Sequence, residues 1–474
     1  MKVCIVGLGY IGFPTACVVA QAGHDVLGID LNREIVDKLN HGGIHILNED
    51  GLAEIAREAF ASGHLRVSEH AEPGDVFILA VPTPCRPVLG CDRANEVKEQ
   101  VAAASHDSRG ETGIPGQYLT LQDEHHDIPT FSADLSYVEQ AACGVAPYIR
   151  PGNLVILEST VSPGTTNTLV RKVLEAGSGL TCGKDFYLAH APERVLPGHI
   201  LRELIENDRI IGGVDDKSTE QAVAFYRTFV RGNVIGTDST TAEVVKLMEN
   251  TYRDVNIALA NEFALICEEL GVNVFQTIAL ANRHPRVNVL KPGPGVGGHC
   301  IAVDPYFLIE AVPEKARLIS VARQVNSAMP LHVLSLFCGM VDESKALGRK
   351  TEKVTALGVS YKADVGDERE SPSLQVIERI RAAGYDVVVH DPYVPRFSGY
   401  TLEDAIRGAD AVVLLTDHTV YRSQFVPEKV VALMRQRLIL DTRGFCGEEW
   451  DRAGFRVVRL GVGTGEQRCW RARL

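Results

Sequence analysis

Residues 291 to 305 read KPGPGVGGHCIAVDP and place a thiol and a carboxylate on one glycine-rich segment. Cys300 follows the glycines, and Asp304 comes four positions later. So much glycine and proline excludes the interior of a helix or strand, so we predict a loop whose backbone can approach a ligand closely. A thiol beside a carboxylate suits covalent catalysis, with water activated next to the adduct. A single cysteine is more often a small buried apolar residue, so other features must decide.

A second group of polar residues follows helical spacing. Lys246 and Asn250 are four positions apart and Arg253 is three further on, so all three share one face of a predicted helix. The opposite face is apolar, which argues against a freely exposed helix. A lysine at an active site could stabilise an oxyanion and lower the pKa of a neighbouring thiol from about 8.5. A solvated polar stripe is the alternative interpretation.

Three glycines near the start of the chain form the pattern G-x-G-x-x-G. Gly7, Gly9 and Gly12 follow an apolar strand pattern and open a predicted helix, and Asp30 ends the next strand. Such a turn lets a pyrophosphate approach the helix N-terminus, where free N–H groups and the helix dipole favour anions. Asp30 would accept hydrogen bonds from ribose hydroxyls and repel a 2′-phosphate. The pattern in this context predicts binding of NAD rather than NADP.

The elements that position these residues alternate between strands and helices. The first 240 residues contain the strand patterns KVCIVGLG, DVLGID, DVFILAVPTP, GNLVILESTV, DFYLAHAP and RIIGGVD. From Glu352 the same alternation returns with VTALGVSY, YDVVVHDP, ADAVVLLTDH and RLILDTRG, and Ser371-Pro372 marks a helix start. Strands alternating with helices predict crossover units on mostly parallel sheets.

A long helix separates the two alternating parts. Thr240 and Glu243 have capping-box spacing, and apolar periodicity continues to Gly271. We therefore expect an α/β fold with two Rossmann-like doubly wound domains joined by a helical middle domain. The expected domains are residues 1–239, 240–345 and 346–474.

Residues 85–131 interrupt the first domain with little periodicity and much Gly, Pro, Asp, Glu and His. Structureless loops of this length are uncommon in compact domains, so a disordered insertion is expected, with a lid as the alternative. His125, His126 and Asp127 lack ligand partners at fixed spacing, so no metal site is expected.

The totals exclude several classes of protein. A net charge of −13 argues against non-specific nucleic-acid binding and against docking on anionic lipid. No apolar run approaches the roughly 18 to 20 residues that span a bilayer. The start lacks the layout of a signal peptide, so a cytoplasmic protein is expected. The 11 cysteines have no paired short spacing, which predicts free thiols, with Cys4, Cys17 and Cys267 in the core.

Several separated motifs carry a resemblance over nearly the whole chain. The motifs are GLGYIG, VPTP, ESTVSPGT, APERVLPG, AEVVKLMENTYRDVNIALANE, GPGVGGHCIAVDP, GVSYKADVGDERESPS and LDTRG. Their types and order resemble the UDP-glucose/GDP-mannose dehydrogenase family. APERVLPG, NRHPRVN and GPGVGGHCIAVDPYF look most like members that act on UDP-N-acetyl-D-mannosamine, and His299 stands where UDP-glucose enzymes usually carry serine.

The resemblance implies oxidation of C6 of a nucleotide sugar from alcohol to carboxylate with two NAD. Cys300 would capture the aldehyde as a thiohemiacetal, a second hydride transfer would give a thioester, and water would cleave it. Lys246 and Asn250 match residues that steady the oxyanion. Asp304 matches a carboxylate that supports water or base chemistry.

The resemblance also implies further site residues. Glu193 matches a glutamate of the hydrolytic step, and Thr160 matches a threonine near the catalytic water and nicotinamide. The expected NAD contacts are Gly7, Gly9, Tyr10, Ile11, Gly12, Asp30, Val81, Thr83 and Arg443. The expected nucleotide-sugar contacts are Arg194, Val195, Arg253, Gly295, Gly297, Lys362 and Arg369, and Arg283 or Arg286 for the site of a partner subunit. A homodimer through the middle domain is expected, with no metal.

The chain departs from the family pattern in places. Pro197 stands where some members carry a second glutamate, and the tail EQRCWRARL matches no known role. Several sugars remain open besides UDP-N-acetyl-D-mannosamine: UDP-N-acetylglucosamine, UDP-glucose or GDP-mannose, because sequence separates C2 epimers poorly. A two-electron β-hydroxyacid dehydrogenase and a non-catalytic NAD-binding regulatory module are competing interpretations of the same motifs.

Overall fold

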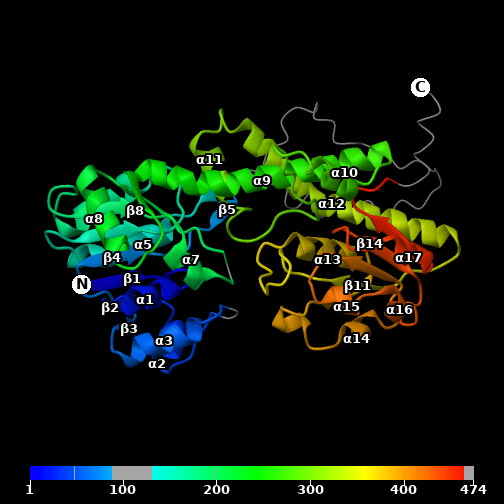
Figure 1. Cartoon of the computed structure of the whole chain (residues 1–474), viewed down its shortest axis with the longest axis horizontal. Coiled ribbons are helices and arrows are strands. Elements are labelled where there is room, and N and C mark those ends of the chain that lie inside the picture. The colour runs from blue at the N-terminus through cyan, green and yellow to red at the C-terminus, as the bar shows by residue number, and fades with distance from the viewer. Residues whose placement is uncertain (47–48, 88–130, 197, 464–474) are drawn as a thin grey trace.

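Two α/β lobes joined by a helical middle region make up the molecule (Figure 1). The computed structural model describes residues 1–46, 49–87, 131–196 and 198–463. Helix α9 (Ser239–Leu270) runs from the N-terminal lobe to the C-terminal lobe. The predicted fold class, with two Rossmann-like units and a long central helix, is confirmed.

The N-terminal lobe is built on a sheet with the order β10-β9-β8-β7-β4-β1-β2-β3. Its strands are β1 (Lys2–Val6), β2 (Asp25–Ile29), β3 (Leu65–Ser68), β4 (Val76–Leu79), β7 (Leu154–Leu157), β8 (Tyr187–His190), β9 (Arg209–Gly213) and β10 (Val234–Asp238). All neighbours pair in parallel except β8 and β9. The order reverses between β1 and β4, and ligands of such sheets bind at that switch point, beyond the carboxyl ends of the strands.

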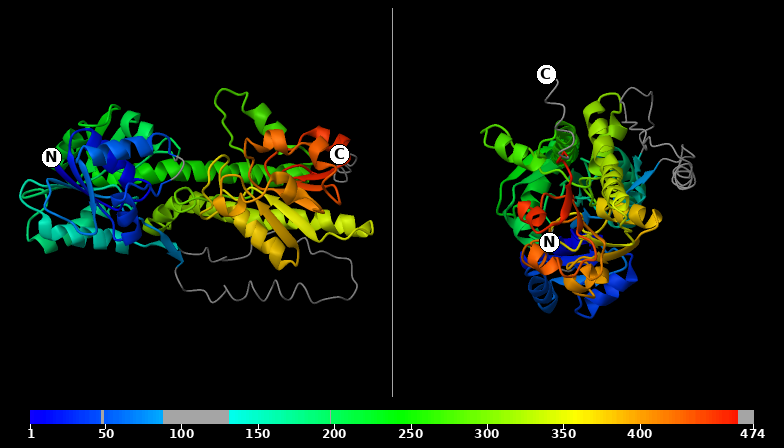
Figure 2. Two further views of the ribbon diagram at one scale, coloured as in Figure 1. Left: turned by 90° about the horizontal axis from the view of Figure 1, so that it is seen from below. Right: turned by 90° about the vertical axis from the view of Figure 1, so that its right-hand side faces the viewer.

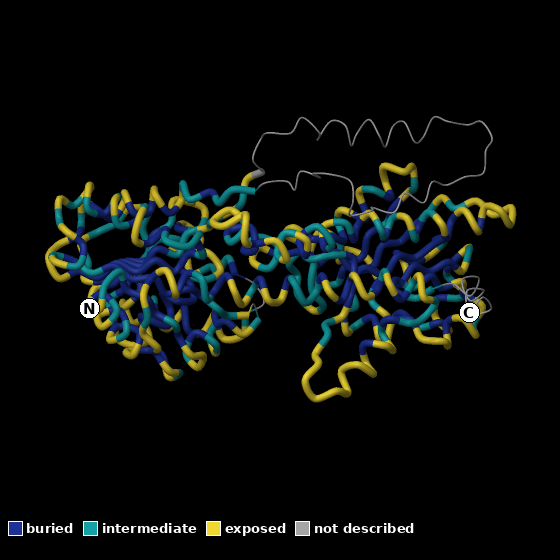
Figure 3. Tube along the Cα trace, turned by 90° about the horizontal axis from the view of Figure 1, so that it is seen from above, coloured by how far each residue is buried: buried dark blue, intermediate teal, exposed yellow. Residues whose placement is uncertain are grey.

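Helices cover both faces of this sheet. They are α1 (Gly12–Gln21), α2 (Arg33–Asn40), α3 (Leu52–Ala61), α5 (Ser136–Val145), α6 (Arg171–Ser178), α7 (Ile200–Glu206) and α8 (Asp216–Tyr226). Strand β1 shows the result: Val3 and Ile5 belong to one hydrophobic core, and Cys4 belongs to the core on the other face. Figure 3 shows the buried residues gathered in the strands of both lobes. The predicted burial of Cys4, Cys17 and Cys267 is confirmed.

The C-terminal lobe has a parallel sheet with the order β12-β11-β13-β14-β15. Its strands are β11 (Lys353–Leu357), β12 (Asp386–His390), β13 (Ala411–Leu414), β14 (Leu438–Asp441) and β15 (Arg456–Arg459). Its helices are α13 (Pro372–Ala382), α14 (Leu402–Ile406), α15 (Tyr421–Gln424), α16 (Pro427–Val430) and α17 (Glu448–Arg452). Ser371 caps α13, as predicted from Ser371-Pro372.

The middle region consists of α9 with α10 (Val274–Ala281), α11 (Asp304–Ala311) and α12 (Arg317–Ala346). Helices α9 and α12 run side by side (Figure 2). Buried polar groups connect them: Arg323 pairs with Asp254 at 2.6 Å, and the Asn326 amide donates to the same carboxylate at 2.8 Å. No helix in the described part of the chain is long and apolar enough to cross a membrane.

The predicted capping box at Thr240 is wrong. Helix α9 begins at Ser239, and its cap is Asp238, two residues before Thr240; the Asp238 carboxylate accepts from the Thr241 N–H at 2.9 Å. Glu243 is buried and instead accepts from the backbone N–H and the hydroxyl of Thr166, at 2.8 and 2.6 Å. A tertiary contact therefore takes the side chain that the local pattern assigned to the helix end. The predicted end at Gly271 is confirmed, with φ 67°.

The segment expected as an insertion from residue 85 begins as a strand. β5 (Cys85–Pro87) pairs antiparallel with β6 (Phe131–Ala133). Residues 88–130, including His125, His126 and Asp127, lie outside the described residues, as do Pro197 and the tail from residue 464. Disorder and a lid therefore both stay predictions for this segment.

We predict that Arg323→Met lowers the free energy of unfolding by about 3 to 5 kcal/mol, because it leaves the Asp254 carboxylate buried without its cation. Urea denaturation followed by circular dichroism measures the change. The control is Arg452→Ala, whose pair with Glu448 lies on an exposed helix surface. Equal denaturation midpoints for the two variants would contradict the prediction.

Candidate active site

The glycine turn after β1 has the shape that a dinucleotide requires. Gly7 has φ +93°, and a Cβ there would lie 2.5 Å from the Ala80 carbonyl oxygen. A Cβ on Gly12 would lie 1.8 Å from the Gly7 carbonyl oxygen, so α1 packs closely against the turn. A Cβ on Gly9 would meet no atom within 4 Å, so this position faces open space. Tyr10 and Ile11 complete the turn, and the residues fit a pyrophosphate at the start of α1.

Asp30 lies beyond β2, beside the same turn. Its carboxylate accepts from the backbone N–H groups of Leu8 and Asn32, both at 2.8 Å. These contacts hold an acidic side chain where the ribose of a dinucleotide would lie. His45, which the sequence analysis did not identify, supports the turn because its Nε2 lies 2.7 Å from the Leu8 carbonyl oxygen.

The ends of β4 and β7 are tied together at the switch point. The Thr83 hydroxyl donates to the Thr160 carbonyl at 2.6 Å, and the Ser159 hydroxyl donates to the Val81 carbonyl at 2.6 Å. The predicted cofactor and water-site residues Val81, Thr83 and Thr160 therefore lie together at one edge of the sheet.

Cys300, Lys246, Asn250 and Asp304 come together where α11 begins beside α9. The Asn250 amide donates to the Asp304 carboxylate at 2.5 Å. The backbone N–H of Asp304 donates to the Cys300 carbonyl at 2.8 Å, so the thiol and the carboxylate are fixed on one turn of chain. Lys246 and Asp304 are buried, whereas Cys300 reaches solvent. A reagent could therefore meet the thiol in a site with a buried cation and a buried base.

Burial and neighbouring charges shift the pKa values of this cluster in opposite directions. Burial raises the pKa of Asp304 to about 6, while Lys246 and the Asn250 hydrogen bond act to lower it. Asp304 is therefore mostly ionised near neutral pH and suited to accept a proton. Although Cys300 as a residue is exposed, the protein around its sulfur desolvates the thiol and raises its pKa; Asp304 adds to this rise, and Lys246 opposes it. The predicted direction of the Lys246 effect on the thiol pKa is confirmed, although desolvation is the larger cause and the net shift is upward.

The cysteine loop lies against residues 361–372 of the C-terminal lobe. A Cβ on Gly297 would lie 2.6 Å from the Glu370 carbonyl oxygen, and one on Gly298 would lie 3.1 Å from the Tyr361 ring. The Gly298 N–H donates to the Arg369 carbonyl at 3.0 Å. Gly295 has φ +134° and faces Pro372. The glycines are therefore required by contact with protein as well as by any contact with a ligand.

Arg369 connects this loop with the glycine turn of the other lobe. Its guanidinium forms two hydrogen bonds to the Asp367 carboxylate, at 2.8 and 2.6 Å, and lies 5.2 Å from the centre of the Tyr10 ring. Burial raises the pKa of Tyr361 to about 12, and Asp367, Cys300 and Tyr10 are near enough to add to the shift. Tyr361 and Arg369 thus lie near both the Cys300 thiol and Tyr10 of the glycine turn.

Glu193 is held by contacts within its own lobe. One carboxylate oxygen accepts from the N–H groups of Arg194 and Val195, at 2.6 and 2.9 Å, and the other pairs with buried Arg209 at 2.5 Å. Arg194 pairs with Glu249 of α9 at 2.6 Å. These contacts shape the loop between β8 and α7, and a hydrolytic role of Glu193 stays a prediction.

Arg209 is also near a second buried acid that sequence reasoning missed. The Tyr226 hydroxyl donates to Glu158 at 2.5 Å, and the Arg209 guanidinium lies 5.8 Å from the Tyr226 ring centre. Burial raises the pKa of Glu158 to about 7, with Glu193 adding to the rise and Arg209 opposing it. Buried strand ends give no signal of such pairing in a single sequence.

Several predicted residues lie apart from the cysteine cluster. Arg253 is exposed on α9, and Arg283 and Arg286 are exposed beyond α10. Arg443 follows β14, pairs with Asp417 at 3.0 Å and faces Gly293. Lys362 lies on the loop that touches the cysteine loop. Their ligand roles stay predictions.

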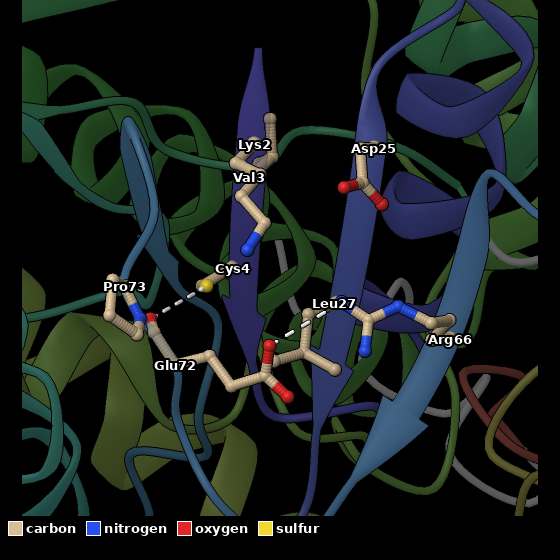
Figure 4. Close-up of a pocket in the computed structure, with 8 residues that line it drawn as sticks. All are labelled: Lys2, Val3, Cys4, Asp25, Leu27, Arg66, Glu72 and Pro73. Atoms are coloured by element: carbon tan, nitrogen blue, oxygen red, sulfur yellow. Dashed lines mark hydrogen bonds and ion pairs between the residues drawn. The ribbon is translucent and has the colours of Figure 1, made fainter.

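A small hollow lies at the opposite ends of the N-terminal strands (Figure 4). Glu72 binds two of its polar neighbours, since Arg66 pairs with the Glu72 carboxylate at 3.4 Å and the Cys4 thiol donates to the Glu72 carbonyl. The hollow is therefore unrelated to the reactive cluster. Within the described ranges, no group of three or more His, Cys, Asp or Glu side chains is arranged to hold a metal.

Models of the UDP-glucose/GDP-mannose dehydrogenase family match three parts of the chain. The NAD binding domain matches residues 1–106 and 121–230, the central domain matches 240–328, and the UDP binding domain matches 355–448. The cysteine cluster lies within the central match, between the two nucleotide-binding matches.

Curated relatives and solved structures agree with these matches. The chain is 42% identical to a UDP-N-acetyl-D-mannosamine dehydrogenase of Methanocaldococcus jannaschii, over 98% of this chain and 97% of that protein. It is 41% identical to an NDP-N-acetyl-D-galactosaminuronic acid dehydrogenase of Ralstonia nicotianae, over 93% and 95%. The structure of a UDP-D-ManNAc dehydrogenase from Pyrococcus horikoshii matches with a TM-score of 0.83 and 40% identity, over 98% and 100%.

We predict that Lys246→Met slows alkylation of Cys300 by iodoacetamide about three- to tenfold near pH 8, because loss of the ammonium raises the thiol pKa further and lowers the thiolate fraction. Peptide mass spectrometry measures the rate across a range of pH. Lys217→Met, on the exposed surface of α8, is the matched control. Superimposable rate–pH curves for Lys246→Met and the unmodified protein would refute the prediction.

Proposed function

This chain belongs to the UDP-glucose/GDP-mannose dehydrogenase family, and from that premise we propose that it oxidises UDP-N-acetyl-D-mannosamine at C6 to UDP-N-acetyl-D-mannosaminuronate. Members of this family are NAD-dependent nucleotide-sugar dehydrogenases. The observation that carries the proposal is the meeting of Cys300, Lys246 and Asn250-bound Asp304 next to Arg369, whose guanidinium also lies over Tyr10 of the glycine turn. The mannosamine relatives, at 42% identity, support the choice of sugar.

In the proposed reaction the alcohol, two NAD and one water give the carboxylate, two NADH and three protons. The glycine turn and Asp30 would hold NAD, which would supply the hydride acceptor for C6. The Cys300 sulfur bonds to the aldehyde carbon, and its proton passes to Asp304, whose pKa of about 6 suits the transfer. Asp304 releases that proton to solvent during the second oxidation. It then accepts a proton from the water that cleaves the thioester and passes it to the departing Cys300 sulfur. The covalent bond keeps the aldehyde from solvent.

Buried Lys246 supports the charge that develops on the substrate oxygen. An ammonium in a desolvated site stabilises an oxyanion more strongly than the same group in water. Asn250 orients the Asp304 carboxylate through its amide hydrogen bond, which leaves the second carboxylate oxygen to exchange the proton. Lys246 thus acts on the substrate oxygen, whereas Asn250 acts on the Asp304 carboxylate.

For the sugar nucleotide, the proposed contacts are on residues 361–372 and the cysteine loop. Arg369 and Lys362 supply positive charge to a protein whose net charge is −13. Asp367 already pairs with Arg369, so a diphosphate would compete with this carboxylate for the guanidinium.

A second candidate keeps the chemistry and changes the sugar. The relative named NDP-N-acetyl-D-galactosaminuronic acid dehydrogenase is 41% identical, almost the same as the mannosamine relatives. A different N-acetylated nucleotide sugar is therefore the runner-up.

We predict that the purified enzyme releases two NADH per UDP-N-acetyl-D-mannosamine, as measured by absorbance, with slower or no release from the N-acetylglucosamine, N-acetylgalactosamine and glucose nucleotides. Cys300→Ser should lower the rate of acid formation at least about 10³-fold, because it removes the thioester route. One NADH per sugar would instead indicate a two-electron dehydrogenase. Near-normal acid formation by Cys300→Ser would remove the covalent mechanism.

We also propose a homodimer formed through α9. The helix carries an exposed apolar stripe at spacings of three, four and seven residues, and these spacings place its members along one side. The stripe comprises Met248, Tyr252, Leu259, Phe263, Ile266 and Leu270. Tyr252 is 68% and Leu270 is 65% exposed, which is unusual for a monomer and suits a self-complementary contact.

We predict that Phe263→Glu with Leu270→Glu gives a monomer by size-exclusion chromatography with light scattering, because the two charges would be buried at the contact. Lys217→Glu, on exposed α8, should leave the mass unchanged. A dimer that survives the double change would exclude the stripe as the contact.

A further inference from the structure

The strand pair β5–β6 is attached to the N-terminal, NAD-binding lobe. Its register pairs Cys85 with Ala133 and Pro87 with Phe131. Directly after β6, Asp134 donates its N–H to the Pro84 carbonyl at 2.8 Å, and its carboxylate pairs with Arg86. The same carboxylate accepts from the Ser136 N–H at 3.1 Å, at the start of α5. The pair is therefore fixed to the end of β4 and to α5.

The far side of the pair contacts helix α11 of the middle region. Glu310 accepts from the Ser132 hydroxyl at 2.6 Å and from the Ala133 N–H at 3.1 Å. The Phe131 ring lies 4.5 Å from the ring of Tyr306, which is only 7% exposed. The contact thus combines two hydrogen bonds to one carboxylate with a packed aromatic pair.

Helix α11 carries this contact to the reactive cluster. Asp304 is its first residue and Glu310 lies six residues further, about 9 Å along a rigid helix. The Cys85 thiol has a pKa raised to about 12, mainly by burial and then by Glu310 and Asp304, so all three groups are neighbours. Displacement of the helix at Glu310 would move the Asp304 carboxylate.

The strand pair is also connected to Thr83, which is expected to lie beside the nicotinamide. Pro84 follows Thr83, whose hydroxyl is bound to the Thr160 carbonyl. Hydride transfer needs the reacting atoms aligned, and a misplacement of about 1 Å can lower a rate about 10²-fold. One short element thus spans from the cofactor side of the site to the helix that bears the base.

We propose that the β5–β6 pair is a strut that holds α11 in register with the NAD-binding lobe, and that Glu310 is a positioning residue for the oxidation. The inference rests on the proposed function for its kinetic consequence. Glu310 touches no reacting atom; it acts through α11 on Asp304 and the adjacent Cys300 loop.

Glu310→Ala is expected to lower kcat about tenfold, while KM for NAD stays within about twofold because the glycine turn is untouched. Glu310→Gln, which keeps one acceptor oxygen, should recover part of the loss, and Ser132→Ala should show a smaller loss. The control is Glu314→Ala, an exposed acid just beyond α11. Steady-state kinetics with the active nucleotide sugar give these values.

A second measurement needs no substrate. The rate of Cys300 alkylation as a function of pH reports the position of Asp304, whose charge raises the thiol pKa. We expect a change of about threefold or more for Glu310→Ala and none for Glu314→Ala. This readout tests the strut even if no nucleotide sugar is oxidised, an outcome that would refute only the proposed function.

A kcat within twofold and an unchanged alkylation curve for Glu310→Ala would overturn the strut. Thermal melting identifies loss of folding. If Glu310→Ala does not fold, Glu310→Gln and Ser132→Ala decide: graded losses support the strut, and kinetics and alkylation like those of the unmodified protein overturn it.

Discussion

The arrangement of the reactive residues depends on one close contact between backbones. The cysteine loop approaches residues 361–372 so closely that side chains at Gly297 and Gly298 would collide with Glu370 and Tyr361. Cys300 belongs to the middle region, and this contact places its loop against the C-terminal lobe. Arg369 then reaches from the same loop to Tyr10 of the dinucleotide turn. The N-terminal lobe, the middle region and the C-terminal lobe therefore all contribute residues to one site.

The sequence was a good guide where a pattern is local. The glycines at positions 7, 9 and 12 with Asp30 indicated the dinucleotide turn, and the Cys300–Asp304 spacing indicated a thiol beside a base. Short strands with polar residues escaped detection, namely β3, β5, β6, β10 and β15. Glu243 illustrates why: it sits at capping-box spacing, yet Thr166 is the partner it binds in the fold.

Pairings between distant elements were out of reach of sequence reasoning. Arg209 and Glu193 are 16 residues apart on different elements, and nothing in either segment announces a buried ion pair. The direction in which Lys246 shifts the pKa of Cys300 could be predicted from its charge, whereas the opposing rise caused by desolvation depends on packing that the sequence does not show. Family resemblance supplied residue identities for the site, but it said nothing of the partners that hold Glu193 or Arg369.

Helix α9 makes contacts with both lobes. It is about 48 Å long by its residue count, packs on β8 and β9 near one end, and near the other accepts the Gly461 N–H on Glu268 at 2.6 Å. A fragment that ends near residue 239 would lack α9, so the surface of β8 and β9 on which the helix packs would be exposed to solvent. A fragment that begins there would expose the matching face of the helix. The lobes are thus poor modules for truncation or recombination, because each relies on contacts with the same helix.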